Sequence, residues 1–286
     1  MAKTGRREFL GLVVGAAAAP AMQAFAGRAE AAAAPSGLPP LPKAPVMTGG
    51  DRGAFVVYDA RSLEPLHAET RGDPLPERTP AASVSKTFCA YAALRGGLLR
   101  EDERILCDGD GWRPEGHGEI AVIDALALSC NAFFEKVGAR LTWESYREAC
   151  DRLGGLSDRL GEKPADLLDR IAAYAHGDLL ATGCEELARL ARAVALADPE
   201  DRALSVVRRG WREAVLRGTA TAANVPGIDA AGKTGTLPGP EGERKFAAFA
   251  PLSEPRWVLA VRTAGAGSAS AAEIAGRVLA RLLTRV

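Results

Sequence analysis

The sequence is poor in the residues that build metal centres and disulfide frameworks. It holds three histidines and five cysteines among 286 residues, and the cysteines stand at irregular spacing without a C-x-x-C pair. An odd number of cysteines in such a pattern is typical neither of a zinc motif nor of a disulfide scaffold. Because no cluster of His, Cys and Asp stands along the chain, we expect no metal and no cofactor. One disulfide bond formed after export is compatible with the count.

An excess of charge of one sign and long apolar runs are missing as well. Lys plus Arg and Asp plus Glu both number 36, which gives a formal net charge of zero. Nothing in this balance indicates nucleic acid as a partner. The apolar run Phe9–Ala19 is far shorter than the ~20 residues that a membrane-spanning helix needs.

The residues on either side of this run indicate an export signal. Arg6-Arg7 is a twin-arginine pair, and Ala24-Phe25-Ala26 is a small-x-small cleavage site. We predict a twin-arginine signal peptide over residues 1–26 and a periplasmic or extracytoplasmic location, with a membrane tether if the signal is not cleaved. Residues 27–52, rich in Ala, Pro and Gly, are predicted to form a linker. The folded domain is then residues 53–286.

Strands are predicted near both ends of this domain and helices between them. Apolar stretches with a central turn indicate strand pairs at Ala54–Glu69 and at residues 245–263. Helical patterns occupy residues 83–97, 119–141, 145–155, 184–198 and 270–283, with a break near Ser129. We predict an α+β fold, in which the N- and C-terminal strands form one antiparallel sheet flanked by helices, with an all-helical lobe inserted.

The stretch Gly227–Thr234 matches the phosphate-loop pattern G-x-x-x-x-G-K-[ST], but its surroundings do not. A phosphate loop follows a buried strand and opens a helix. Here the preceding residues are small, polar and interrupted by proline, and Pro238 and Pro240 follow too closely for a helix to begin. We therefore expect Lys233-Thr234-Gly235 to form a short strand.

Three short sequence motifs follow one another along the chain and together indicate a serine nucleophile with a lysine base. Ser83 and Lys86 form S-x-x-K at the start of a predicted helix, Ser129 and Asn131 form S-x-N at a break between helices, and Lys233-Thr234-Gly235 forms K-T-G. A serine hydroxyl needs a base beside it to act as a nucleophile. Spacing of three places Lys86 one helical turn from Ser83. Burial and a second lysine, for which Lys233 is a candidate, would keep such a lysine neutral and basic.

Together these patterns resemble a known family. S-x-x-K and K-T-G, with a serine motif between them, belong to β-lactamases and penicillin-binding proteins. Residues 107–141, 217–236 and 246–261 resemble the transpeptidase domain of class B penicillin-binding proteins around the same motifs. The resemblance covers most of the domain from about residue 55 onward and implies a β-lactamase/transpeptidase-like fold. The family usually has Gly before the nucleophile, where this chain has Ala82.

The resemblance assigns roles residue by residue. It implies that Ser83 is the acylated nucleophile, that Lys86 is its general base and that Ser129 relays a proton to the leaving group. Asn131 would hold the peptide amide and orient Lys86. In the K-T-G motif, Lys233 would assist catalysis and bind the substrate carboxylate.

The remaining implied positions bind substrate. Thr234 would hold the carboxylate with Lys233, Gly235 completes the motif, and Thr236 would supply one oxyanion-hole N–H, with Ser83 supplying the other. The resemblance implies D-Ala-D-Ala stem peptides of peptidoglycan as substrates and β-lactams as inhibitors. Family members carry an N-terminal pedestal domain where this chain has the predicted linker, so a cell-wall protein partner could take its place.

The sequence leaves transpeptidase and carboxypeptidase activity open, and two other functions compete with them. A class D-like β-lactamase has a similar fold, but that family typically has S-x-V where this chain has Ser129-Cys130-Asn131. Glu162 lies where class A enzymes carry a deacylating Glu, without the surrounding pattern. A non-catalytic β-lactam or peptidoglycan sensor would keep the fold alone.

Each motif residue also has a purely structural interpretation. Ser83 could cap a helix, and Ser129 and Asn131 could end one helix and cap the next. His117, within Gly-His-Gly, is interpreted as a structural loop residue, and Cys130 as a thiol without a role. The arginine-rich run at residues 205–217 is interpreted as a solvated helix face.

Overall fold

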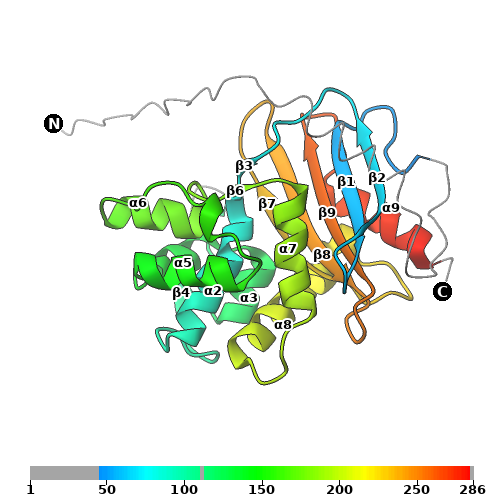
Figure 1. Cartoon of the computed structure of the whole chain (residues 1–286). Coiled ribbons are helices and arrows are strands. Elements are labelled where there is room, and N and C mark those ends of the chain that lie inside the picture. The colour runs from blue at the N-terminus through cyan, green and yellow to red at the C-terminus, as the bar shows by residue number, and fades with distance from the viewer. Residues whose placement is uncertain (1–44, 110–112, 284–286) are drawn as a thin grey trace.

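A five-stranded antiparallel sheet forms the centre of the computed structural model, which describes residues 45–109 and 113–283. The strand order is β2-β1-β9-β8-β7 (Figure 1). The strands are β1 (Gly53–Asp59), β2 (Pro65–Arg71), β7 (Ala231–Thr236), β8 (Glu243–Ala250) and β9 (Trp257–Ala264). Because β1 pairs with β9, the two ends of the domain meet in one sheet. The predicted α+β fold is confirmed.

Both faces of this sheet are covered, so its central strands are apolar on both sides. Phe55 and Val57 of β1 face helix α9 (Ala271–Leu283), whereas Val56 and Tyr58 belong to the core shared with the helical lobe. In Figure 1 helix α9 lies on one side of the sheet, and the helices of the lobe, such as α2, α5 and α7, lie on the other. Helix α7 (Cys184–Ala195) packs on β8 and β9 from the lobe side.

The inserted lobe is mostly helical, as predicted. Its main helices are α2 (Lys86–Arg95), α3 (Val122–Leu128), α4 (Asn131–Gly138), α5 (Trp143–Arg152), α6 (Leu167–Ile171) and α8 (Arg202–Arg217). Helices α3 and α4 are separated at Ser129, where the break was predicted. Two small strand pairs, β3 (Thr79–Pro80) with β6 (Ala181–Thr182) and β4 (Ile105–Cys107) with β5 (Gly118–Ile120), were not predicted.

Helix α8 carries its arginines on its outer face, in agreement with the predicted solvated face. Its opposite face is buried, with Val207 and Trp211 in the lobe core. A side chain at Gly210 would lie 2.6 Å from Leu126, so the glycine allows α8 to pack closely against α3. The arginines occupy only the outer part of a helix that belongs to the core.

The described chain begins within the predicted linker. Val46 and Met47 are buried against the sheet, and their amides donate hydrogen bonds of 2.8 and 2.9 Å to the carboxylate of Glu69. The last residues of the predicted linker 27–52 therefore pack on the domain, while the predicted signal peptide 1–26 lies outside the described residues.

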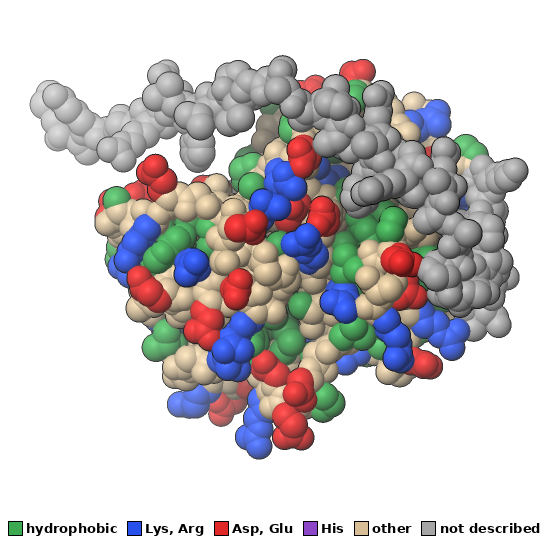
Figure 2. All heavy atoms as spheres, viewed as in Figure 1, with side chains coloured by type: hydrophobic (Ala, Val, Ile, Leu, Met, Phe, Trp, Pro, Cys, Tyr) green, Lys and Arg blue, Asp and Glu red, His purple; other side chains and the backbone are tan. Residues whose placement is uncertain are grey.

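On the face seen in Figure 2, acidic and basic side chains are interspersed. Within residues 45–109 and 113–283, every helix is too short or too polar to cross a lipid bilayer. No two cysteines of this part of the chain are joined in a disulfide.

Candidate active site

The first motif forms a buried serine–lysine pair at the start of the central helix. Ser83 lies in a 3-10 turn, Ala82–Ser85, that leads directly into α2. The Nζ atom of Lys86 donates a hydrogen bond of 2.7 Å to Ser83 Oγ. Lys86 is fully buried, whereas Ser83 is partly exposed. The hydroxyl is thus accessible from outside, and its neighbouring amine is shielded from water.

The turn that presents Ser83 is held by its neighbours in space. Ala82 adopts a left-handed φ of 52°, a region that disfavours residues with a Cβ atom. The Ala81 amide donates to the carbonyls of Gly177 and Leu180, at 3.1 and 2.7 Å. A Cβ atom at Gly177 would lie 2.3 Å from the Ala82 carbonyl oxygen, so only glycine allows this approach.

The second motif meets the third across a long sequence separation. Ser129 ends α3 in a left-handed conformation, with φ of 56°, which turns its side chain out of the helix. Lys233 on β7 donates hydrogen bonds of 2.8 Å to Ser129 Oγ and 2.9 Å to its neighbour's carbonyl, Thr234 O. Asn131 begins α4 and is half-buried, and its side chain makes no hydrogen bond to the described chain.

The K-T-G motif lies on the edge strand of the sheet. Within β7, Lys233 is fully buried, Thr234 is half-buried and Thr236 is exposed. The Thr234 hydroxyl lies 2.6 Å from that of Thr219, which precedes the strand. Gly235 has no room for a side chain, since a Cβ atom would lie 2.9 Å from the Ala81 carbonyl oxygen. The glycine therefore allows β7 to pass beside the turn that carries Ser83.

The two lysines belong to one electrostatic site. Burial and, next, the charge of Lys86 lower the pKa of Lys233 well below its usual value. When two buried amines repel each other, the state in which both are ammonium ions is disfavoured. The Ser83–Lys86 and Ser129–Lys233 pairs are therefore electrostatically coupled, and protonation of one amine disfavours protonation of the other.

The phosphate-loop interpretation is excluded by this geometry. Lys233 and Thr234 lie inside β7, and the chain then enters β8 rather than a helix. A phosphate loop requires the amides of a helix N-terminus at that point.

The structure corrects the expectation that no metal-ligand cluster is present. Cys107 Sγ and His117 Nδ1 lie 3.3 Å apart, and the ligand atoms of Cys107, His117 and Cys130 all lie within 4.8 Å of one another. Two thiols and one imidazole are ligand types that bind Zn²⁺. The cluster could not be predicted from the sequence, because its three residues lie in different segments: β4, the loop before β5, and the break between α3 and α4. His117 and Cys130 thus lie together with Cys107, while their interpretation as a structural loop residue and a thiol without a role stays a prediction.

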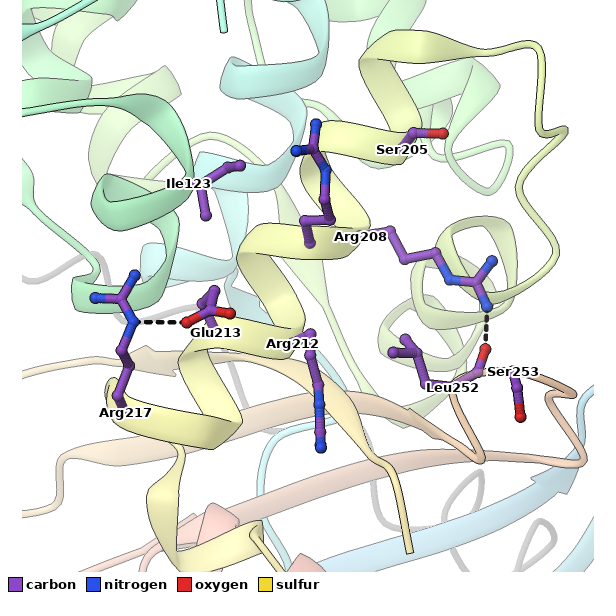
Figure 3. Close-up of a pocket in the computed structure, with 9 residues that line it drawn as sticks. Ile123, Ser205, Arg208, Arg212, Glu213, Arg217, Leu252 and Ser253 are labelled. Atoms are coloured by element: carbon purple, nitrogen blue, oxygen red, sulfur yellow. Dashed lines mark hydrogen bonds and ion pairs between the residues drawn. The ribbon is translucent and has the colours of Figure 1, made fainter. Parts of the chain in front are cut away.

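A separate groove of about 710 Å³ runs along α8, away from the serine–lysine pairs. Figure 3 shows Arg212 and Arg217 from α8, Ile123 from α3 and the loop residue Leu252, whose carbonyl accepts from Arg208. Arg217 pairs with Glu213, and carboxylates outside the groove, Asp124, Asp229 and Glu101, pair with Arg217, Arg212 and Arg209. Because most of this positive charge is already neutralised, we assign the groove no ligand.

Sequence reasoning missed several residues that hold the site. Gly177 contacts the Ser83 turn and Thr219 contacts Thr234, although neither belongs to a motif. A single sequence does not show which of its glycines adopt a positive φ. Thr219 lies in the segment whose resemblance to the approach of K-T-G was noted, and that was the only available signal.

The fold is that of penicillin-binding protein transpeptidase domains. Residues 200–284 match the family model of the penicillin binding protein transpeptidase domain. A comparison with curated proteins gives no match. The resemblance stated from the sequence is confirmed in this matched segment and in the fold.

Three solved structures illustrate the similarity of fold. A D,D-transpeptidase domain of a peptidoglycan glycosyltransferase from Eggerthella lenta has a TM-score of 0.68 at 18% identity, covering 84% of this chain and 79% of that one. The transpeptidase domain of the FtsI4 D,D-transpeptidase from Legionella pneumophila has a TM-score of 0.63 at 20% identity, covering 81% and 88%. A PBP2 structure from Helicobacter pylori, in complex with MreC, has a TM-score of 0.66 at 19% identity, covering 82% of this chain and 59% of that one.

Proposed function

We propose that this protein is a penicillin-binding serine acyltransferase that acts on peptidoglycan stem peptides ending in D-Ala-D-Ala through an acyl-enzyme on Ser83. The observation that carries the proposal is the 2.7 Å hydrogen bond between the buried Lys86 amine and the partly exposed Ser83 hydroxyl. A nucleophile within hydrogen-bond reach of a shielded base is the arrangement that acyl transfer requires.

In the first step, Ser83 Oγ attacks the carbonyl carbon of the penultimate D-Ala while its proton passes to neutral Lys86 Nζ. The carbonyl carbon–nitrogen bond then breaks, and the leaving D-Ala nitrogen takes a proton from Ser129 Oγ. Lys233 Nζ, 2.8 Å from Ser129, replaces that proton. The lysine pair thus carries one excess proton before and after acylation, and the substrate carboxylate would keep Lys233 protonated against the lowering of its pKa by burial.

Substrate binding uses the edge of the sheet. Strand β7 lies at the edge of the sheet and would supply main-chain groups beside Ser83. Thr234 with Lys233 would bind the terminal carboxylate. The amides of Ser83 and Thr236 would stabilise the oxyanion, a contribution worth about 3–4 kcal/mol per donor in serine hydrolases. Asn131 would hold the substrate amide.

The location and the partner are proposals as well. The twin-arginine pair and cleavage site support export to the compartment where peptidoglycan lies. The similar PBP2 from Helicobacter pylori was solved in complex with MreC. We propose that this protein also works with a cell-wall protein partner.

The test is release of D-alanine from a pentapeptide that ends in D-Ala-D-Ala, compared with one that ends in D-Ala-L-Ala. We expect release from the first only, and none from a Ser83→Ala variant. Transfer to an added amine acceptor separates transpeptidase from carboxypeptidase activity. Sustained turnover of a chromogenic cephalosporin, without D-alanine release, would instead assign a β-lactamase.

A further inference from the structure

A cluster of buried charged residues lies next to the proposed site and takes no part in the chemistry described above. It consists of Lys245 and Glu243 on β8 and Arg262 on β9, which are 0%, 5% and 2% exposed. Lys245 lies opposite Arg262 on one side and opposite Gly235 of the K-T-G motif on the other. Lys245 and Arg262 are therefore in the same row of the sheet as Gly235.

The hydrogen bonds of this cluster connect it to β6 and to the chain of residues 77–79, which leads to Ser83. Lys245 Nζ donates to Thr79 O at 2.9 Å, to Thr182 O at 3.1 Å and to Thr182 Oγ1 at 2.8 Å. Glu243 accepts from Arg262 at 2.6 Å and from the Thr79 hydroxyl at 2.6 Å. Arg262 also donates to the carbonyl oxygen of Glu77 at 2.9 Å.

The cluster forms hydrogen bonds to β3 and β6, and both strands lie close to the turn that carries Ser83. Thr79 and Thr182 pair with each other as β3 and β6. The Ala81 amide, two residues before Ser83, is bound by the carbonyls of Gly177 and Leu180 just before β6. A shift of either strand would therefore move the turn that sets the position of Ser83 Oγ.

Stability alone does not account for such a cluster. Well-packed apolar residues in place of a buried ion group are often neutral or stabilising, because charges are costly to remove from water. Burial lowers the pKa of Lys245 to about 7, which reflects that cost. The hydrogen bonds from Lys245 to the carbonyl oxygens of Thr79 and Thr182 offset this cost of burial, and an apolar side chain could not form them.

We infer that Lys245 is a positioning residue, which with Glu243 and Arg262 clamps β3 and β6 to the sheet and so holds the Ser83 turn in its reactive geometry. The inference rests on the proposed function for its kinetic consequence. Misplacement of a reacting group by about 1 Å can lower a rate about 100-fold.

The test compares Lys245→Met, which keeps the length of the side chain and removes its donors, with Thr182→Val, which removes one acceptor. For each, the rate constant of covalent reaction with a fluorescent penicillin is separated from the preceding binding constant. We expect Lys245→Met to lower the rate constant about 10- to 100-fold with unchanged binding, and Thr182→Val to lower it less. Leu259→Ala, on the opposite face of β9, is the control for loss of stability alone.

Hydrogen–deuterium exchange over residues 79–85 gives a readout that is independent of chemistry. We expect faster exchange there in Lys245→Met and Thr182→Val, and no local change in Leu259→Ala. If the folded Lys245→Met protein reacts at the wild-type rate and its exchange is unchanged, the clamp is refuted while the proposed function stands. If the wild type never reacts with penicillin, the proposed function fails, and the exchange data alone still decide whether the clamp exists.

Discussion

Lys233 Nζ lies 2.8 Å from Ser129 Oγ although the two residues are 104 positions apart in the chain. One belongs to the edge strand of the sheet and the other to a helix break in the inserted lobe. Their contact fixes the lobe against the sheet at the point where Ser83 and Lys86 also lie. The proposed chemistry depends on this junction, and the predictions below examine its parts.

The base role of Lys86 predicts a large kinetic effect with a normal fold. We expect Lys86→Met to lower the rate of Ser83 acylation about 100- to 10,000-fold, the usual contribution of a general base. Lys163→Met is the matched control, because Lys163 is exposed and pairs only with Glu144 on the surface. Stopped-flow or gel-based labelling with penicillin measures both. Equal rates in the two variants would remove Lys86 from the mechanism.

The close contact between Gly177 and Ala82 predicts that a side chain at position 177 would displace the turn that carries Ser83. At Gly177, φ is 78° and a Cβ atom would meet the backbone of Ala82, whereas at Gly155, φ is 65° and the space is open. Both Ala variants carry left-handed strain, but Gly177→Ala adds an overpacking cost of about 1–3 kcal/mol. We expect urea unfolding to show that difference, and labelling of Ser83 to be lost only in Gly177→Ala. Normal labelling of that variant would contradict the described packing.

The departure at Ala82 predicts an unusual stabilisation. A left-handed residue with a Cβ atom costs about 1–2 kcal/mol, and glycine loses about 0.5–1 kcal/mol in chain entropy. Ala82→Gly should therefore raise the free energy of unfolding by up to about 1.5 kcal/mol. In the control Ala90→Gly, within α2, the same change should cost about 1 kcal/mol. Thermal unfolding that ranks the two variants in the opposite order would show that Ala82 is not strained.

Burial of Lys245 predicts a particular dependence of stability on pH. Its pKa falls from about 10.4 in the unfolded chain to about 7 in the fold. Between these values the unfolded state binds the extra proton, so this group makes stability rise with pH, by up to about 1.4 kcal/mol per unit. Burial of Lys245 therefore lowers the free energy of unfolding most below pH 7.

The measurement for this prediction is urea unfolding of wild type and Lys245→Met from pH 7 to 9. We expect the difference in unfolding free energy between them to grow with pH in favour of wild type. The exposed Lys163→Met variant should follow the wild-type curve. A Lys245→Met curve parallel to wild type would mean that Lys245 titrates normally.

Much of this architecture could be predicted because the relevant signals are local. The strand pair before α2, the break at Ser129 and the two strands after K-T-G each follow from apolar patterns and turn residues within a short window. The three motifs pointed to Ser83, Lys86, Ser129 and Lys233, and the structure brings these residues together in two hydrogen-bonded pairs.

The rest depended on contacts between distant segments. Strands β3 and β6 have two residues each, too few for any periodic pattern. Lys245 stands at the start of an apolar strand, where a lysine would normally be exposed. Its burial follows from the positions of Thr79 and Thr182, which are set by the fold as a whole. The grouping of Cys107, His117 and Cys130 has the same origin.

The central claim is that Ser83 forms a covalent acyl-enzyme. The most direct test incubates the mature protein with a fluorescent penicillin and follows the label over time, beside a Ser83→Ala variant of equal thermal stability. The account predicts stable label on the wild type and none on Ser83→Ala. Label that appears on both proteins, or on neither, would contradict it.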